Sequence, residues 1–206
     1  MRYKFRLSSL ILIVVFIISF TACTTPETAA ETTTTETTIT ETTAPVTTAT
    51  ETTENIKNKD AELFFEAIRD YNITLKAFEY ATAVLEIMND YVDTKTKTLK
   101  MTKEEVGNRF MELANKVQMD YMVIVVVKEK ILDKNGITEI TPDMLRAVDL
   151  IVQWQENKKK EYEYTAKYYY GDGAEYDIKA DELSTESDNI ADEYSKLLNT
   201  IMQQQN

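Results

Sequence analysis

Few side chains in this 206-residue chain are suited to covalent or acid–base chemistry. Cys23 is the only cysteine, and there is no histidine. The lack of histidine excludes Ser-His-Asp and Cys-His catalysis and any zinc site with a histidine ligand. Carboxylate pairs such as Glu161/Glu163 and Asp181/Glu182 are suited to acid–base work. The sequence supplies no second group to raise one pKa of such a pair, so we predict a solvated face and no enzyme. A hydrolase that uses carboxylates alone is the enzymatic alternative.

A cluster of tyrosines is the most distinctive constellation in the chain. Its members are Tyr162, Tyr164, Tyr168, Tyr169 and Tyr170. Tyrosine combines a large contact area with a polar tip, and it recurs at binding surfaces. On a helix the five cannot all face one core. Either Tyr162 and Tyr169 pack inside while the others lean on neighbouring helices, or Tyr164, Tyr168 and Tyr170 form a binding surface for a solute or glycan.

Two acidic segments contain carboxylates that could bind a metal ion. The segment that begins Asp133-Lys-Asn135-Gly136 resembles an EF-hand loop, but Thr138 stands at the sixth position and Met144 at the twelfth. Calcium chemistry requires glycine and a bidentate carboxylate at those positions. A second acidic group has no recognisable ligand spacing; its members are Asp172, Glu175, Asp177 and Asp181. We therefore predict no metal site and no cofactor.

The N-terminal segment has the features of a secretory signal. Three basic residues precede an unbroken apolar run from Leu10 to Ile18, and the segment ends in Phe20-Thr21-Ala22-Cys23. This ending resembles a bacterial lipoprotein lipobox. The resemblance implies cleavage before Cys23 and a lipid on its sulfur, which would attach the protein to the cell membrane. The alternative is an uncleaved signal anchor. Both interpretations place the rest of the chain on the extracytoplasmic side.

A threonine-rich segment follows the cysteine. Seventeen of the residues 24–54 are threonine, and none is aromatic. Such a composition cannot bury enough surface to offset the entropy of ordering the chain, so we predict a disordered tether. The expected organisation is a signal peptide at 1–22, a lipidated cysteine and tether at 23–55, and a helical domain at 56–206.

The first two helices of this domain are predicted from apolar spacing. A single amphipathic helix is expected over about 58–92, with this inner face: Phe64, Ile68, Tyr71, Leu75, Phe78, Ala81, Leu85, Met88 and Val92. A capping box, Thr102 to Glu105, begins the second helix, and Asn135-Gly136 ends it. Residues 121–127 are apolar on every side. We prefer a helix there over a buried strand, because the spacing of three and four continues through it.

Two further helices complete the predicted fold. Thr141-Pro142-Asp143 begins the third, which Gly171-Asp-Gly173 ends. The fourth runs from about Tyr176 to Ile201, and its inner face includes Ala180, Ser187, Ile190 and Tyr194. Four amphipathic segments with short connections predict an all-α protein, an up-down-up-down four-helix bundle.

The charge balance narrows the choice of partners. The chain carries a formal net charge of −12. An acidic surface disfavours nucleic acid and anionic lipid headgroups as partners.

We expect a membrane-tethered, non-catalytic module that binds a protein or the cell wall. Its candidate apolar surface is Met122, Val123 and Val126 in the second helix, because a helix apolar on every side must be covered on more than one face. Self-association of two copies is one way to cover it. The alternative function is a solute- or glycan-binding lipoprotein that uses Tyr164, Tyr168 and Tyr170.

Overall fold

The computed structural model describes residues 59–93, 95–132 and 136–204. The signal segment, Cys23, the threonine-rich segment and Asp133–Asn135 lie outside the described residues. Within the described ranges the chain is helical and contains no strand, only an isolated bridge between Val92 and Leu99. Residues 59–68 are helical, and four long helices follow: α3 (Ile73–Tyr91), α4 (Lys103–Leu132), α5 (Pro142–Tyr170) and α6 (Glu175–Gln203). The predicted all-α class and helical bundle are confirmed.

The predicted single helix over 58–92 is wrong. Residues Arg69–Tyr71 form a short 3-10 turn, and Asn72 leaves the helix with ψ of 128°. The Asn72 side chain accepts a hydrogen bond from the Thr74 backbone N–H at 2.9 Å, so it begins α3 as an N-cap. Asparagine favours this role because its amide oxygen satisfies an otherwise free N–H of the first helical turn.

The break at Asn72 changes which side of α3 faces the core. Ile73, Tyr80 and Ile87 are buried, whereas Leu75, Phe78 and Leu85, predicted to face inward, are 40–52% exposed. An uninterrupted helix would have kept Leu75 on the same side as the buried Ile68, seven residues earlier. The interruption rotates the second half of the pattern, so these three residues point outward, although Met88 of the predicted face still packs against the core.

The helix ends farther along the chain follow the predictions from local sequence. In the capping box, the Glu105 N–H donates to Thr102 Oγ1 at 3.1 Å, and the Thr102 N–H donates to Glu105 Oε2 at 2.6 Å. Thr141 caps α5 by accepting from the Met144 N–H. Gly171 ends α5 in the left-handed conformation with φ of 90°, a conformation that favours glycine. Helix α4 is continuous through residues 121–127, so the strand alternative there is wrong.

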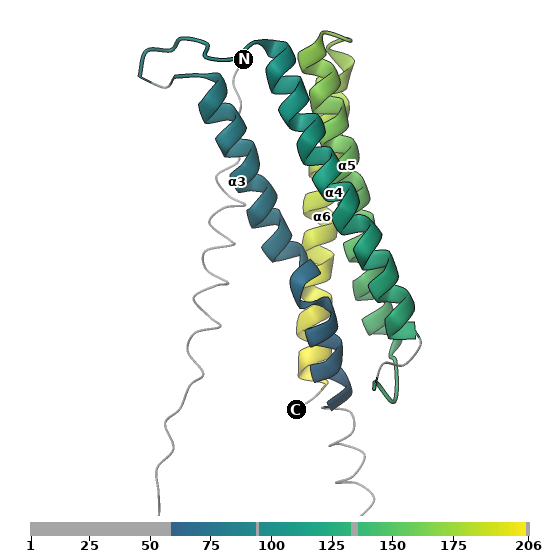
Figure 1. Ribbon diagram of the computed structural model, residues 1–206. Helices are drawn as coiled ribbons and strands as arrows, with labels where there is room; N and C mark the ends of the chain where they lie inside the picture. The colour runs from purple at the N-terminus through teal and green to yellow at the C-terminus, as the bar shows by residue number, and fades with distance from the viewer. Residues whose placement is uncertain (1–58, 94, 133–135, 205–206) are drawn as a thin grey trace, which may run out of the picture. The chain divides into compact units, whose positions relative to one another are not determined.

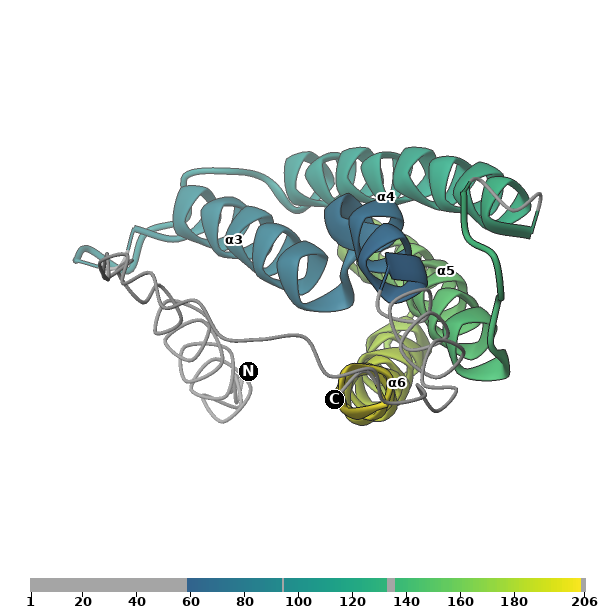
Figure 2. The ribbon, with the colours of Figure 1, turned by 90° about the horizontal axis from the view of Figure 1, so that it is seen from below.

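Helix α5 is the centre of the packing. It lies along α4 on one side and along α6 on the other, with successive helices running in opposite directions (Figure 1). In the view of Figure 2, α3 extends to the left, away from α5 and α6. Trp154 of α5 is among the largest fully buried side chains and stacks on Tyr80 of α3, with ring centroids 5.7 Å apart. This stacked pair joins α3 to the core.

Candidate functional site

An apolar ridge runs along the outer side of α4. It consists of Met119, Met122, Val123 and Val126, which are 44–63% exposed. Their spacing of three and four residues places them on one side of the helix, while Val117 and Ile124 face the core and are fully buried. The predicted residues Met122, Val123 and Val126 are therefore at the surface and share one face. The sequence prediction missed Met119, which continues the same spacing one turn earlier.

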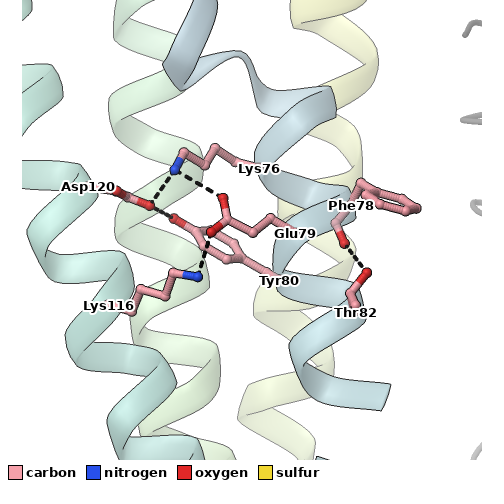
Figure 3. A network of polar contacts seen from close by, with 7 residues as sticks. All are labelled: Lys76, Phe78, Glu79, Tyr80, Thr82, Lys116 and Asp120. Carbon is pink, nitrogen blue, oxygen red and sulfur yellow. Dashed lines mark hydrogen bonds and ion pairs between the residues drawn. The ribbon is translucent and has the colours of Figure 1, made fainter. Parts of the chain in front are cut away.

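A second apolar surface lies on the outer side of α3. It consists of Leu75, Phe78 and Leu85 and is called the α3 stripe below. Figure 3 shows Phe78 pointing away from α4 and from the polar side chains between the two helices. The prediction missed this surface because it placed these residues inside. Asn72, a favoured N-cap residue, was the available signal.

A polar network joins α3 to α4 (Figure 3). The Tyr80 hydroxyl donates to Asp120 Oδ2 at 2.6 Å, and Lys76 Nζ lies 2.9 Å from the same oxygen. Lys76 also contacts Glu79 at 3.1 Å, and Glu79 contacts Lys116 of α4. These contacts place residues 76–80 of α3 level with residues 116–120 of α4. Because the two helices run in opposite directions, Leu75 and Phe78 of the α3 stripe lie near the level of Met119 and Met122, whereas Leu85 lies farther along α3, beyond the ridge.

The electrostatics of the network favour its charged form. Hydrogen bonding to Lys116, and then to Lys76, lowers the pKa of Glu79 despite partial burial. Burial opposes the charge on Lys76, but hydrogen bonds to Asp120 and Glu79 outweigh it, so its pKa is raised. Burial, followed by the bond to Asp120, raises the pKa of Tyr80 far above its ordinary value. Glu79 and Lys76 therefore stay charged and Tyr80 stays protonated near neutral pH, so the network acts as a structural connection.

A polar hollow lies beside the α4 ridge, between α4 and α5. It has a volume of about 170 Å³ and is lined by Gln118, Tyr121, Glu156, Lys159 and Lys160. Both lysines form ion pairs on their own helix: Lys160 lies 2.8 Å from Glu156, and Lys159 lies 3.5 Å from Glu163. Such partly exposed pairs contribute little stability. The ridge is therefore bordered by cations that are able to exchange partners.

Tyr162 and Tyr169, two of the five clustered tyrosines, are buried, as the packing interpretation predicted. Tyr162 lies edge-on to Tyr80 with a centroid distance of 6.3 Å, and Tyr169 stacks on Phe110 of α4 at 5.8 Å. Burial raises the pKa of Tyr162 well above its ordinary value. These two tyrosines act as core residues.

The other three tyrosines contact different neighbours. Tyr164 pairs with Tyr176 of α6 at 5.8 Å between centroids, and Tyr168 lies edge-on to Tyr169 at 5.4 Å. Tyr170 lies over Gly107 of α4, where an added Cβ would come within 2.5 Å of its ring. The Tyr170 hydroxyl donates to Asn108 Oδ1 at 2.8 Å. These contacts direct Tyr164 toward α6 and Tyr170 toward α4, so they do not form one shared platform.

One of the predicted carboxylate pairs is divided between two ion pairs. Glu161 contacts Lys158 at 2.7 Å, with both side chains largely buried, while Glu163 contacts Lys159. Burial raises the pKa of Glu161, and Lys158 partly offsets this rise. Asp181 and Glu182 lie on the exposed side of α6. Glu161 is therefore one member of a largely buried ion pair with Lys158, and this contact gives no indication of a substrate.

In residues 59–93, 95–132 and 136–204, no group of three or more His, Cys, Asp or Glu side chains is arranged to hold a metal ion. None of the helices in those ranges is long and apolar enough to cross a membrane.

The chain was compared with protein-family models, with curated proteins and with solved structures. None of these comparisons gave a match.

Proposed function

We propose that this chain is a lipoprotein of the extracytoplasmic membrane face, carrying a non-catalytic helical module that binds a protein or cell-wall partner. The N-terminal segment ending in Cys23 supports the anchor, and the composition of residues 24–54 supports a tether. The finer architecture we propose is an up-down-up-down four-helix bundle mounted on this tether.

The exposed apolar surface is the main support for a binding function. The α4 ridge and the α3 stripe expose seven large apolar side chains on neighbouring helices. Contiguous apolar surface on a soluble domain marks interaction sites more often than isolated apolar residues do. Methionine suits such a surface because its flexible thioether adapts to different partners.

The anchor is tested by labelling and fractionation. Cells that express the full chain are grown with a labelled fatty acid, and membranes are separated from soluble material. We expect label on the wild-type protein in the membrane fraction and none on a Cys23→Ala variant. An intact mass that corresponds to a free, full-length N-terminus would contradict lipidation.

The second candidate is a solute- or glycan-binding lipoprotein, and one observation supports it. Lys179 lies 4.9 Å from the Tyr176 ring centre and 5.7 Å from that of Tyr164, and Lys167 lies within 6 Å of both. Aromatic rings beside cations are suited to binding sugars with anionic groups. Calorimetry with soluble wall glycan fragments tests this candidate. Heat that is lost in a Tyr164→Ser variant supports it, and no heat with the wild type contradicts it.

A further inference from the structure

We propose that the partner of the exposed apolar surface is a second copy of this chain, with the α3 stripe of each copy packed on the α4 ridge of the other. This inference rests on the proposed binding role of the surface and is independent of the lipid anchor. A second copy would cover both surfaces, which the described residues leave exposed.

The amount of exposed apolar surface fits a dimer. The α3 stripe and the α4 ridge hold most of the large apolar side chains that are exposed in the described residues. The remainder, Leu99, Tyr170 and Ile178, belong to neither surface. The exposed parts of the seven side chains amount to on the order of 600 Å² per copy, against about 800 Å² per partner in a standard interface. With the polar rim added, the surface reaches the size that a stable dimer needs.

The charges that border the two surfaces are complementary. The exposed Glu86 directly follows the stripe residue Leu85 on α3, whereas Glu79 is held by Lys76 and Lys116 of its own chain. Lys159 and Lys160 line the hollow beside the α4 ridge, and each is paired only with a partly exposed glutamate of its own helix. Because those pairs are weak, the lysines can turn to carboxylates of a second copy as the apolar faces meet.

The positions of the stripe and the ridge favour a two-fold symmetric contact. The Lys76–Asp120 and Glu79–Lys116 pairs hold the two helices in register, with Leu75 and Phe78 of the stripe near the level of the first part of the ridge. A two-fold axis pairs residue i of one copy with residue j of the other, and j with i. The stripe-on-ridge contact is therefore made twice, and the assembly closes at two copies. The network also holds both helices in place before binding, which lowers the entropy lost on association.

The test measures the mass of the purified full chain in neutral detergent. Light scattering over a concentration series is corrected for bound detergent and lipid. We expect the protein mass to reach twice that of one chain and to stop there. A single-chain mass at every concentration would overturn the proposal, and growth beyond two copies would overturn its symmetry.

Three matched variants locate the contact. Met122→Glu and Phe78→Glu each place a charge on an exposed position of the proposed interface, and each should raise the dimer dissociation constant at least about tenfold. Ile178→Glu on α6 is the control, since Ile178 is 61% exposed and lies outside both surfaces. Circular dichroism confirms that each variant is folded. Dissociation by Met122→Glu alone would overturn the pairing of α3 with α4, and equal dissociation by Ile178→Glu would overturn the assigned surface.

The Cys23→Ala variant separates this proposal from the lipoprotein proposal. We expect it to lose the fatty-acid label while keeping the same dissociation constant. A dimer that forms only with the lipidated chain would overturn the stripe-on-ridge contact and leave the anchor intact.

Discussion

Helices α3 and α6 differ in how they join the rest of the bundle. Helix α6 packs along the length of α5 through side chains such as Ile190, Tyr194 and Ile201. Helix α3 makes fewer contacts and depends on the Tyr80–Trp154 stack and on the polar network to α4. Their outward sides differ as well, because α3 presents its apolar stripe, whereas α6 presents mainly charged and polar residues.

The buried polar groups show the same contrast. On α3 the Tyr80 hydroxyl is paired with Asp120, 40 residues away. On α6 the Tyr194 hydroxyl and Ser187 Oγ are buried without a hydrogen-bond partner among the described residues, and so are both side-chain amide atoms of Gln155 on α5. Helix α6 is therefore held mainly by the burial of apolar side chains. The buried polar atoms without a described partner reduce the free energy that this burial provides. Attachment of α3 depends on a few specific contacts, so it should be the more easily lost.

Removing the Tyr80 ring should have the largest effect on this contrast. Tyr80→Ala eliminates the stack on Trp154 and the bond to Asp120, at a cost of about 3–5 kcal/mol. Because α3 has few other contacts, we expect its amides to exchange with solvent while α4, α5 and α6 stay protected. Hydrogen exchange with mass spectrometry measures this. Uniform loss of protection in all four helices would show that α3 is not a separate unit.

Asp60 anchors the segment that precedes α3. Its carboxylate is buried and accepts the backbone N–H groups of Thr138 and Glu139, each at 2.8 Å. Asp60→Ala leaves both donors unpaired and should cost roughly 2–3 kcal/mol in the free energy of unfolding. Asp60→Asn should be intermediate, because its single amide oxygen can replace only one of the two carboxylate oxygens that accept these N–H groups. Equal denaturation midpoints for the two variants would contradict this role.

Replacing tyrosine by phenylalanine compares the paired hydroxyl of Tyr80 on α3 with that of Tyr194 on α6, which is unpaired in the part of the chain that the structure describes. Tyr80→Phe removes one of the two donors to Asp120, Lys76 being the other, and should cost about 1 kcal/mol. Tyr194→Phe removes a buried hydroxyl that has no partner among the described residues and should be neutral or stabilising by up to about 1 kcal/mol. Urea denaturation of both variants measures the difference. Destabilisation of both by the same amount would place a hydrogen-bond partner at Tyr194.

Acid should produce the smallest effect, with opposite signs on the two sides. The pKa of Glu79 is lowered from 4.5 by its hydrogen bonds to Lys116 and Lys76, so its stabilisation is present above pH 4.5 and lost as the pH falls below that value. The pKa of Glu161 is raised from 4.5 by burial, with Asp188 and Asp181 adding to the rise, so protonation stabilises the α5–α6 side as the pH falls toward 4.5.

Melting curves between pH 7 and pH 3 measure this opposition. We expect Glu161→Gln to remove the gain on mild acidification and Glu79→Gln to remove the loss below pH 4.5. The Glu79 effect should be a few tenths of a kcal/mol, because its side chain is partly exposed and solvent screens the pairs. A wild-type profile that Glu161→Gln leaves unchanged would contradict the assignment.

The sequence by itself determined the helical class and most helix ends. Thr102 with Glu105, Thr141 with Pro142, and Gly171 act through hydrogen bonds and backbone preferences within about four residues, and each lies where the local pattern placed it. The inward positions of Tyr162 and Tyr169 followed from the same helical periodicity. These features depend only on near neighbours in the chain, so they could be predicted.

Tertiary structure decided the outward surface and the connections between helices. Leu75, Phe78 and Leu85, predicted to be core, are exposed because α3 packs on its neighbours through Ile73, Tyr80 and Ile87. Two contacts join residues far apart in the sequence: the Tyr80–Asp120 hydrogen bond and the packing of Tyr170 on Gly107. The exposure of the α4 ridge depends on which helices pack beside α4. Periodicity shows that a helix has an apolar side, but which side is buried depends on the elements that pack against it.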